Sequence, residues 1–195
     1  MQLNRNTQTE SWKLTSKIIL IISVIAILVL FPPKLCAQNS TTGNNGNIYQ
    51  NFKTEFIWEA KVKIANMINV GESKRGVRRV IPITGGTFAG TKIKGEVLSG
   101  GEDCQLVRPD GDTELNACYL LKTDDGYVIQ VTNNALIHTD STTNAFYCKS
   151  VLDLEAPKNC PYDYLNHAIF IGTLKMPELK AGEEPYVVIG VYKLL

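Results

Sequence analysis

The chain has 195 residues, with 20 basic and 19 acidic side chains and a formal net charge of +1. Such a balance leaves no basic surface of the kind that attracts nucleic acid, so nucleic acid is not expected as a partner. Five cysteines without a CxxC motif and two lone histidines, His138 and His167, do not predict a metal site, and no cofactor motif is present.

The chain begins with a basic and then apolar segment. Three basic residues precede an apolar run of 14 residues, 18–31, which is shorter than the ~20 residues that cross a bilayer as a helix. A diproline and a small residue, Ala37, follow, so we expect a secretory signal peptide over residues 1–37 with cleavage after Ala37. The alternatives are an uncleaved membrane anchor and lipid attachment at Cys36, which the neighbouring Pro33 and Lys34 disfavour.

A signal peptide predicts a secreted or periplasmic protein that meets the membrane only through its N-terminal segment before cleavage. Its removal takes away four basic residues and one acidic residue, which changes the formal net charge to −2. Residues 38–48 are almost entirely polar and predict a disordered linker. Residues 49–195 are enough chain for one folded domain with one core.

Apolar residues beyond the linker recur with the period of two that is typical of half-buried strands. Turn sequences punctuate this region at 71–76, 85–86, 109–112 and 124–126. About nine short strands at regular spacing, without helical periodicity, predict an all-β sandwich or barrel. The expected strands are 56–64, 79–83, 92–98, 103–108, 113–123, 127–135, 143–150, 166–174 and 185–194.

Cysteines in an exported chain favour disulfides. Four remain after loss of the signal peptide, so two bridges with three possible pairings are expected. Cys104 and Cys118 flank the turn at 109–112, which favours their pairing across two strands. The remaining pair would be Cys148 with Cys160, closing a short loop.

Two motifs suggest phosphate binding but are better explained otherwise. The glycine-rich stretch 85–92 resembles a phosphate loop, yet Thr91 precedes Lys92 and a strand follows, where a phosphate loop has Lys before Ser or Thr and a helix. We interpret the stretch as a tight turn between strands. The basic pairs at 74–75 and 78–79 are interpreted as a solvated loop.

Longer motifs carry a resemblance to a known family. They are Arg79-Val-Ile-Pro-Ile-Thr-Gly-Gly-Thr-Phe, Gly95-Glu-Val-Leu-Ser-Gly-Gly and Leu106-Val-Arg-Pro-Asp-Gly. With weaker matches, they span residues 56–195. The chain resembles uncharacterised-protein family 0311, also called domain of unknown function 3237. This resemblance implies a single closed, mostly antiparallel β-barrel, similar to lipocalin-like or allene-oxide-cyclase-like barrels, with an interior pocket and no agreed reaction.

Two carboxylates are candidate catalytic groups. Glu96 lies between Gly95 and Val97, and Asp103 follows two glycines. An acidic side chain inside a barrel is costly unless it is hydrogen-bonded or used. If both face the interior, one could act as a general acid with a raised pKa and the other as a base. The alternative is that both face solvent or cap turns.

Other polar residues on or beside the expected strands would suit a mostly apolar pocket. We expect them to bind a ligand, although tyrosines at a barrel rim and satisfied core amides need none. These candidates are Gln105, Arg108, Tyr119, Asn133, Tyr147 and Asn166.

The sequence therefore predicts an exported barrel that binds a small, partly apolar molecule. It could act on that molecule by acid–base chemistry of the isomerase, cyclase or lyase type, with Tyr119 and Asn166 orienting a substrate oxygen. The alternatives are a lipocalin-like binding protein without chemistry, and an envelope interaction protein whose barrel is filled by side chains. Neither the ligand nor the oligomeric state is predicted.

Overall fold

The computed structural model describes residues 52–195, so the expected signal peptide and the whole expected linker lie outside the described residues. The described part forms ten strands and one short 3-10 helix, η1. They are β1 (Thr54–Ile64), β2 (Ile68–Ser73), β3 (Gly76–Ala89), β4 (Lys94–Val97), β5 (Gly101–Val107), β6 (Thr113–Thr123), β7 (Val128–Thr139), β8 (Phe146–Glu155), η1 (Asp163–His167), β9 (Phe170–Lys175) and β10 (Tyr186–Leu194).

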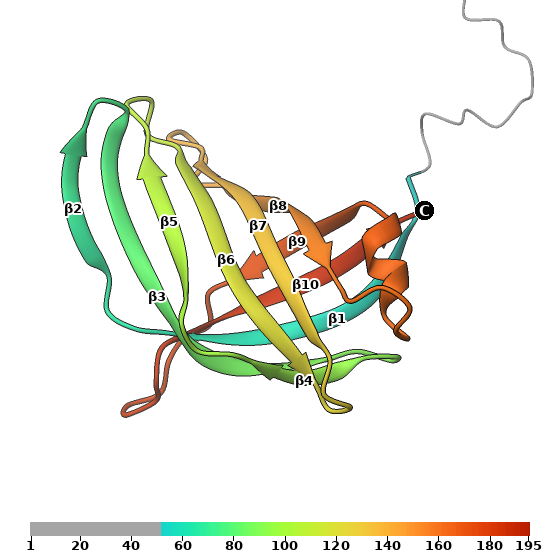
Figure 1. Ribbon diagram of the computed structural model, residues 1–195. Coiled ribbons are helices and arrows are strands. Elements are labelled where there is room, and N and C mark those ends of the chain that lie inside the picture. The colour runs from blue at the N-terminus through green and yellow to red at the C-terminus, as the bar shows by residue number, and fades with distance from the viewer. Residues whose placement is uncertain (1–51) are drawn as a thin grey trace, which may run out of the picture. The chain divides into compact units, whose positions relative to one another are not determined.

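These strands close into an antiparallel barrel of eight strand positions, which confirms the expected fold class (Figure 1). Neighbours in the barrel follow the order β1, β10, β9, β8, β7 and β6, and β3 closes the circle by pairing with β1. Between β6 and β3, the short strands β4 and β5 share one position, because each pairs with both neighbours. Within the described residues β2 pairs with β3 alone.

Alternation of side chains produces this closure. Along β6, buried and exposed residues alternate without a break from Thr113 to Thr123. Because successive side chains of a strand point to opposite faces, one set of residues fills the barrel and the other meets solvent. The hairpin between β6 and β7 has Gly126 at φ 93°, as the Asp-Asp-Gly turn predicts.

Some predicted element boundaries are wrong. A strand that was not expected, β2, takes in residues 71–73 of the expected turn at 71–76, so that the turn is confined to residues 74–75, and β8 continues to Glu155. Moreover, β3 passes through Gly85 and Gly86 instead of turning there. Gly86 has φ 138°, and a Cβ atom on it would lie 2.0 Å from the carbonyl oxygen of Lys61 on β1. Glycine at this position permits the close approach that seals the barrel.

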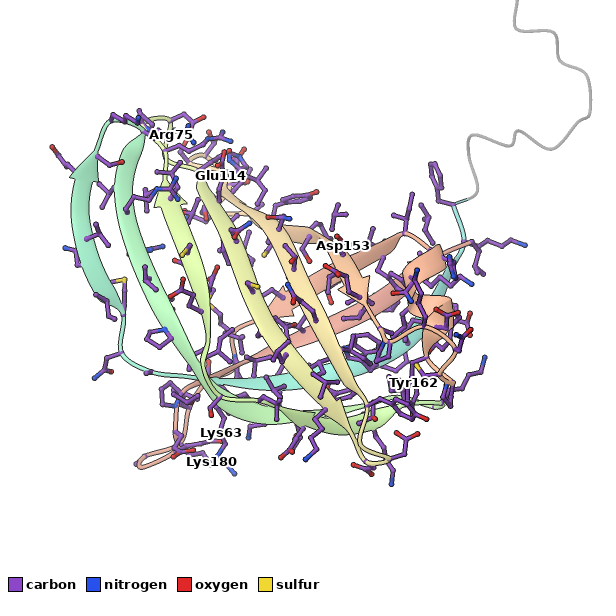
Figure 2. The ribbon with its side chains drawn as sticks, viewed as in Figure 1. Lys63, Arg75, Glu114, Asp153, Tyr162 and Lys180 are labelled. Atoms are coloured by element: carbon purple, nitrogen blue, oxygen red, sulfur yellow. The ribbon has the colours of Figure 1, made fainter. Side chains whose placement is uncertain are left out.

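The end of the barrel beside η1 is filled by closely packed side chains. Side chains from several strands are almost fully buried there and η1 covers them with Leu165, which is 1% exposed. The largest of these side chains are Trp58, Phe170, Leu121, Ile129 and Val131. Tyr162, beside η1 in Figure 2, donates a hydrogen bond of 3.0 Å from its hydroxyl to Asp125 in the β6–β7 turn.

The other end of the barrel is formed by β2, the β5–β6 and β7–β8 turns and the loop between β9 and β10. An ion pair of 2.6 Å joins Lys63 on β1 to Glu184 in that last loop, which also carries Lys180 (Figure 2). Large apolar side chains are exposed at this end, among them Met67, Phe146 and Met176. In residues 52–195 there is no helix with the length and apolarity needed to span a bilayer.

Candidate functional site

A cavity of about 410 Å³ occupies the barrel interior on the side away from η1. Residues that are exposed at the open end, Met67, Phe146 and Met176, belong to its wall, so the cavity reaches the surface beside them. Most of the wall is apolar, and the polar groups come mainly from β3, β5, β6 and β7. The polar lining residues are Arg79, Asp103, Gln105, Thr113, Tyr119, Asn133, Ser150 and Thr173.

Three of these polar side chains form a hydrogen-bonded chain. Arg79 on β3 pairs in register with Gln105 on β5, and its Nε donates a 2.7 Å hydrogen bond to Gln105 Oε1. The other end of the Gln105 amide, Nε2, donates a 2.6 Å hydrogen bond to Asp103 Oδ2. Because the amide is bound at both ends, its orientation is fixed, and it holds one oxygen of the Asp103 carboxyl group.

The second oxygen of Asp103 has no hydrogen-bond partner within residues 52–195. Its Oδ1 is buried without a hydrogen bond among the described residues, and so is Oδ1 of Asn133 on β7. Asp103, Ala117 and Asn133 are register partners on three neighbouring strands. The small side chain of Ala117 therefore lies between two buried acceptors. Unpaired buried polar atoms are rare in proteins and mark a place where a ligand or water completes the hydrogen bonding.

Burial also changes proton affinity in the cavity. Removal from solvent raises the pKa of Asp103, while its hydrogen bond from Gln105, the nearby backbone of Asn116 and the charge of Arg79 oppose this effect more weakly. Tyr119 is 3% exposed, and burial raises the pKa of its phenol, which stays a neutral hydrogen-bond donor at physiological pH. The arrangement joins a carboxyl group suited to proton transfer with neutral groups that can orient an oxygen.

The structure brings four of the eight candidate residues together in the cavity wall: Asp103, Gln105, Tyr119 and Asn133. Their catalytic and binding roles stay predictions. The remaining four candidates lie elsewhere.

Glu96 does not face the interior, which corrects the expectation of a catalytic pair. It is exposed on β4 and lies 3.7 Å from the ammonium group of Lys122 on the outer surface. On this strand of only four residues Val97, not Glu96, is the buried neighbour. Asp103 is therefore without the second carboxylate that was expected to share the proton chemistry.

Arg108 and Tyr147 lie outside the cavity, although both were expected to line it. They border a wide hollow of about 1130 Å³ on the outer face of the sheet. Arg108 is also engaged with the acidic side chains of Asp110, Asp112 and Glu114 around the β5–β6 turn. Its charge is thus already neutralised by neighbours, in contrast to the unpaired acceptors of the inner cavity.

Asn166 lies in η1 and outside the cavity wall, which corrects its expected position on a strand beside the ligand. Its side chain accepts a hydrogen bond from the backbone N–H of Ala156 and donates to the carbonyl of Ala156 and to Asp163. These contacts attach η1 to the end of β8, at the packed end of the barrel.

All four cysteines of residues 52–195 are free thiols. The expected pair Cys148–Cys160 is not bridged: β8 carries the chain from Cys148 to Glu155 in extended form, roughly 23 Å away at 3.3 Å per residue. Cys104 lies opposite Asn116 rather than opposite Cys118. Such diagonal neighbours have Cα atoms roughly 7–8 Å apart, farther than a disulfide usually spans, and they are not bridged.

Arg79 is a site residue that the sequence analysis missed. Its basic cluster predicted a solvated loop, but β3 begins at Gly76 and alternation turns Arg79 inward while Arg78 lies by the outer hollow. Extending the strand pattern from Ile81 and Ile83 back by two residues would have pointed to Arg79. The two histidines lie outside the cavity: His138 bonds Asp112 at 2.6 Å, and His167 lies 3.9 Å from Asp163.

The fold and the cavity define a small antiparallel β-barrel with one polar cluster inside an otherwise apolar pocket. Residues 52–194 match the family model described as Protein of unknown function (DUF3237), so the chain belongs to this family, as the sequence motifs predicted. Within residues 52–195, no group of three or more His, Cys, Asp or Glu side chains is arranged to hold a metal ion.

Relatives support the same conclusion. A UPF0311 protein of Rhodopseudomonas palustris is 42% identical over 81 residues, which are 42% of this chain and 53% of that protein. The chain thus matches about half the length of this curated relative. A crystal structure of a conserved protein of unknown function from Rhodopseudomonas palustris has a TM-score of 0.66 at 30% identity, covering 74% of this chain and 99% of that one. A beta-barrel like protein from Acinetobacter baumannii AYE gives a TM-score of 0.65 at 29% identity, with 74% and 97% covered.

Proposed function

We propose that the protein binds a small, largely apolar molecule inside the barrel and transfers a proton on it through Asp103, without a cofactor. One observation carries the proposal: a buried carboxyl group is held at Oδ2 by Gln105, and its Oδ1, at the wall of a 410 Å³ cavity, has no hydrogen-bond partner among residues 52–195. The phenol of Tyr119 and the amide of Asn133 would orient the substrate oxygen. Proton transfer by such a positioned group contributes roughly 10²–10⁴-fold to a rate.

A general test uses 5-nitrobenzisoxazole. This compact substrate can be deprotonated by any well-placed carboxylate in apolar surroundings. The Asp103 carboxylate takes the ring C–H proton, the electrons of that bond form a nitrile, and the N–O bond breaks to release a coloured phenolate. Asp103→Asn should lower kcat/KM by about 100-fold or more, because the amide cannot accept the proton. The wild-type rate should rise with pH through the raised pKa of Asp103, since only the carboxylate acts as the base.

Glu96→Gln is the matched control, since it removes one carboxylate from the outer surface. This variant should keep the wild-type rate. Wild-type turnover no faster than that of free acetate at equal concentration, or equal losses in both variants, would contradict a catalytic Asp103.

Binding without chemistry is the second candidate, supported by the mostly apolar wall and the exposed apolar residues at its mouth. It predicts tight, unprocessed ligand and no effect of Asp103→Asn on any turnover. The third hypothesis, an interaction protein with a filled barrel, does not fit a cavity of 410 Å³.

We also propose that the protein acts outside the cytoplasm, on the evidence of the sequence of residues 1–37 alone. Fractionation of cells that make the full chain should recover a species that begins at Gln38, as intact-mass measurement would show. Full-length protein in the cytoplasmic fraction would contradict export.

A further inference from the structure

Arg79 has a free hydrogen-bonding end. Only its Nε has a protein partner among residues 52–195, which is Gln105 Oε1, and the two terminal nitrogens of the guanidinium group make no hydrogen bond or ion pair there. Arginine binds anions best through these paired terminal N–H groups, which match a carboxylate in a two-pronged geometry. The Nε end of the guanidinium group is thus anchored, while the described residues leave its terminal N–H groups free to donate.

Within residues 52–195, the cavity wall carries one basic and one acidic side chain. Among the described residues that line the cavity, Arg79 and Asp103 are the charged ones. Gln105 stands between them and bonds both, so the guanidinium group is not consumed by a direct ion pair with the carboxyl group. A guanidinium group beside an apolar wall, without a bound counter-ion from the protein, favours a ligand that brings its own negative charge.

We propose that the cavity recognises an apolar organic monoanion, a carboxylate or a group of similar shape, whose charged end binds the terminal nitrogens of Arg79. The apolar body of this ligand lies along the side chains that form the rest of the wall. This inference extends the proposed function to a class of ligand. Its second part, that the reacting atom of such a ligand lies beside Asp103 Oδ1, rests on the proposed function.

Strand geometry limits the size of the ligand. Arg79 is the register partner of Gln105, and Asp103 is two residues along the same strand, β5. Two residues of a strand span roughly 6–7 Å, so the anionic group and the reacting atom are separated by about the width of one six-membered ring with a substituent. Small aromatic or alicyclic acids meet this requirement.

A pair of fluorescent probes separates the effect of the ligand's charge on binding from the effect of its apolar ring system. 1-Anilinonaphthalene-8-sulfonate and N-phenyl-1-naphthylamine share one ring skeleton and differ by the anionic sulfonate group. Arg79→Met should weaken binding of the sulfonate probe about tenfold or more and leave binding of the neutral probe within about twofold. Arg78→Met removes the same charge from the neighbouring residue by the outer hollow, and should change neither affinity.

Arg79→Gln serves as a second neutral variant, and urea unfolding identifies which variants keep the fold. Equal weakening of both probes in a folded Arg79 variant, no weakening of either, or no binding of the sulfonate probe to the wild type would overturn the proposal. The experiments test the proposed anion site and the proposed proton transfer independently of each other. Asp103→Asn abolishes benzisoxazole turnover only if Asp103 is the base, whereas probe selectivity depends on Arg79 alone.

Discussion

The two ends of the barrel are built by the same strands but differ in what fills them. Near η1, Leu121 on β6 and its register partner Ile129 on β7 are both fully buried in packed core. Toward the open end the same two strands carry Ala117 opposite Asn133 and Leu115 opposite Ala135, all in the cavity wall. An unchanged alternation therefore gives a solid core where inward side chains are large, and a pocket where they are small or polar.

The largest expected effect on the free energy of unfolding comes from truncating one large side chain at each end of the barrel. Leu121→Ala should lower the free energy of unfolding by about 3 kcal/mol, because it leaves a void in packed core. Leu115→Ala should cost only about 1 kcal/mol, because Leu115 already borders the cavity. Urea unfolding with a shared m-value measures both changes. Equal losses would mean that the open end is as tightly packed as the other.

Enlargement of an alanine at each end makes the reverse test. Ala60→Leu on β1 should cost about 2 kcal/mol, because Ala60 is fully buried in the packed core and overpacking forces neighbours to move. Ala117→Leu should cost less than about 1 kcal/mol, since the new side chain extends into the cavity between Asp103 and Asn133. It should also abolish binding of the neutral naphthylamine probe. Retained probe binding in Ala117→Leu would place the ligand elsewhere.

The smallest expected effect is a pH dependence of stability. Because the pKa of Asp103 is raised in the folded state by burial, the folded protein holds this proton to higher pH than the unfolded chain. The contribution of Asp103 to stability is thus most favourable below the ordinary aspartate range and falls as pH rises through the raised pKa. Asp103→Asn should remove this decline and gain on the order of 1 kcal/mol near neutral pH.

Urea unfolding of both proteins between pH 3 and pH 7 measures the difference in slope. Asp153→Asn is the matched control, since Asp153 is exposed on the outer face of β8 (Figure 2). Parallel curves for the wild type and Asp103→Asn would show that the carboxyl group is solvated and would weaken the case for proton transfer.

Part of the fold and of the candidate site was predictable because alternation is a local property. It identified most strands and, along β5, β6 and β7, the inward positions of Asp103, Gln105, Tyr119 and Asn133. It failed for Glu96, because a strand of four residues carries too few apolar positions to tell which face is buried. It failed for Arg79, which was the first residue of an expected strand, because its basic cluster was interpreted as a solvated loop.

The cysteines and Asn166 show a second limit. Cys148 and Cys160 were expected to pair because they remained after Cys104 and Cys118, yet the strand that follows Cys148 extends away instead of folding back. Asn166 was placed on an expected strand, but residues 163–167 form η1, whose contacts with Ala156 depend on where β8 ends. Both errors concern the conformation of the chain next to a correctly expected strand. Packing at the end of the barrel decides that conformation.

The sequence alone determined the all-β class and the family, and it singled out Asp103, Gln105, Tyr119 and Asn133 as polar candidates on the strands, because side-chain alternation and motif order are encoded along the chain. The tertiary structure alone decided that β1 closes on β3 at Gly86, that Arg79, Gln105 and Asp103 form one hydrogen-bonded chain, and that a cavity remains beside Ala117. These features join residues on different strands, and their distances exist only once the barrel has closed.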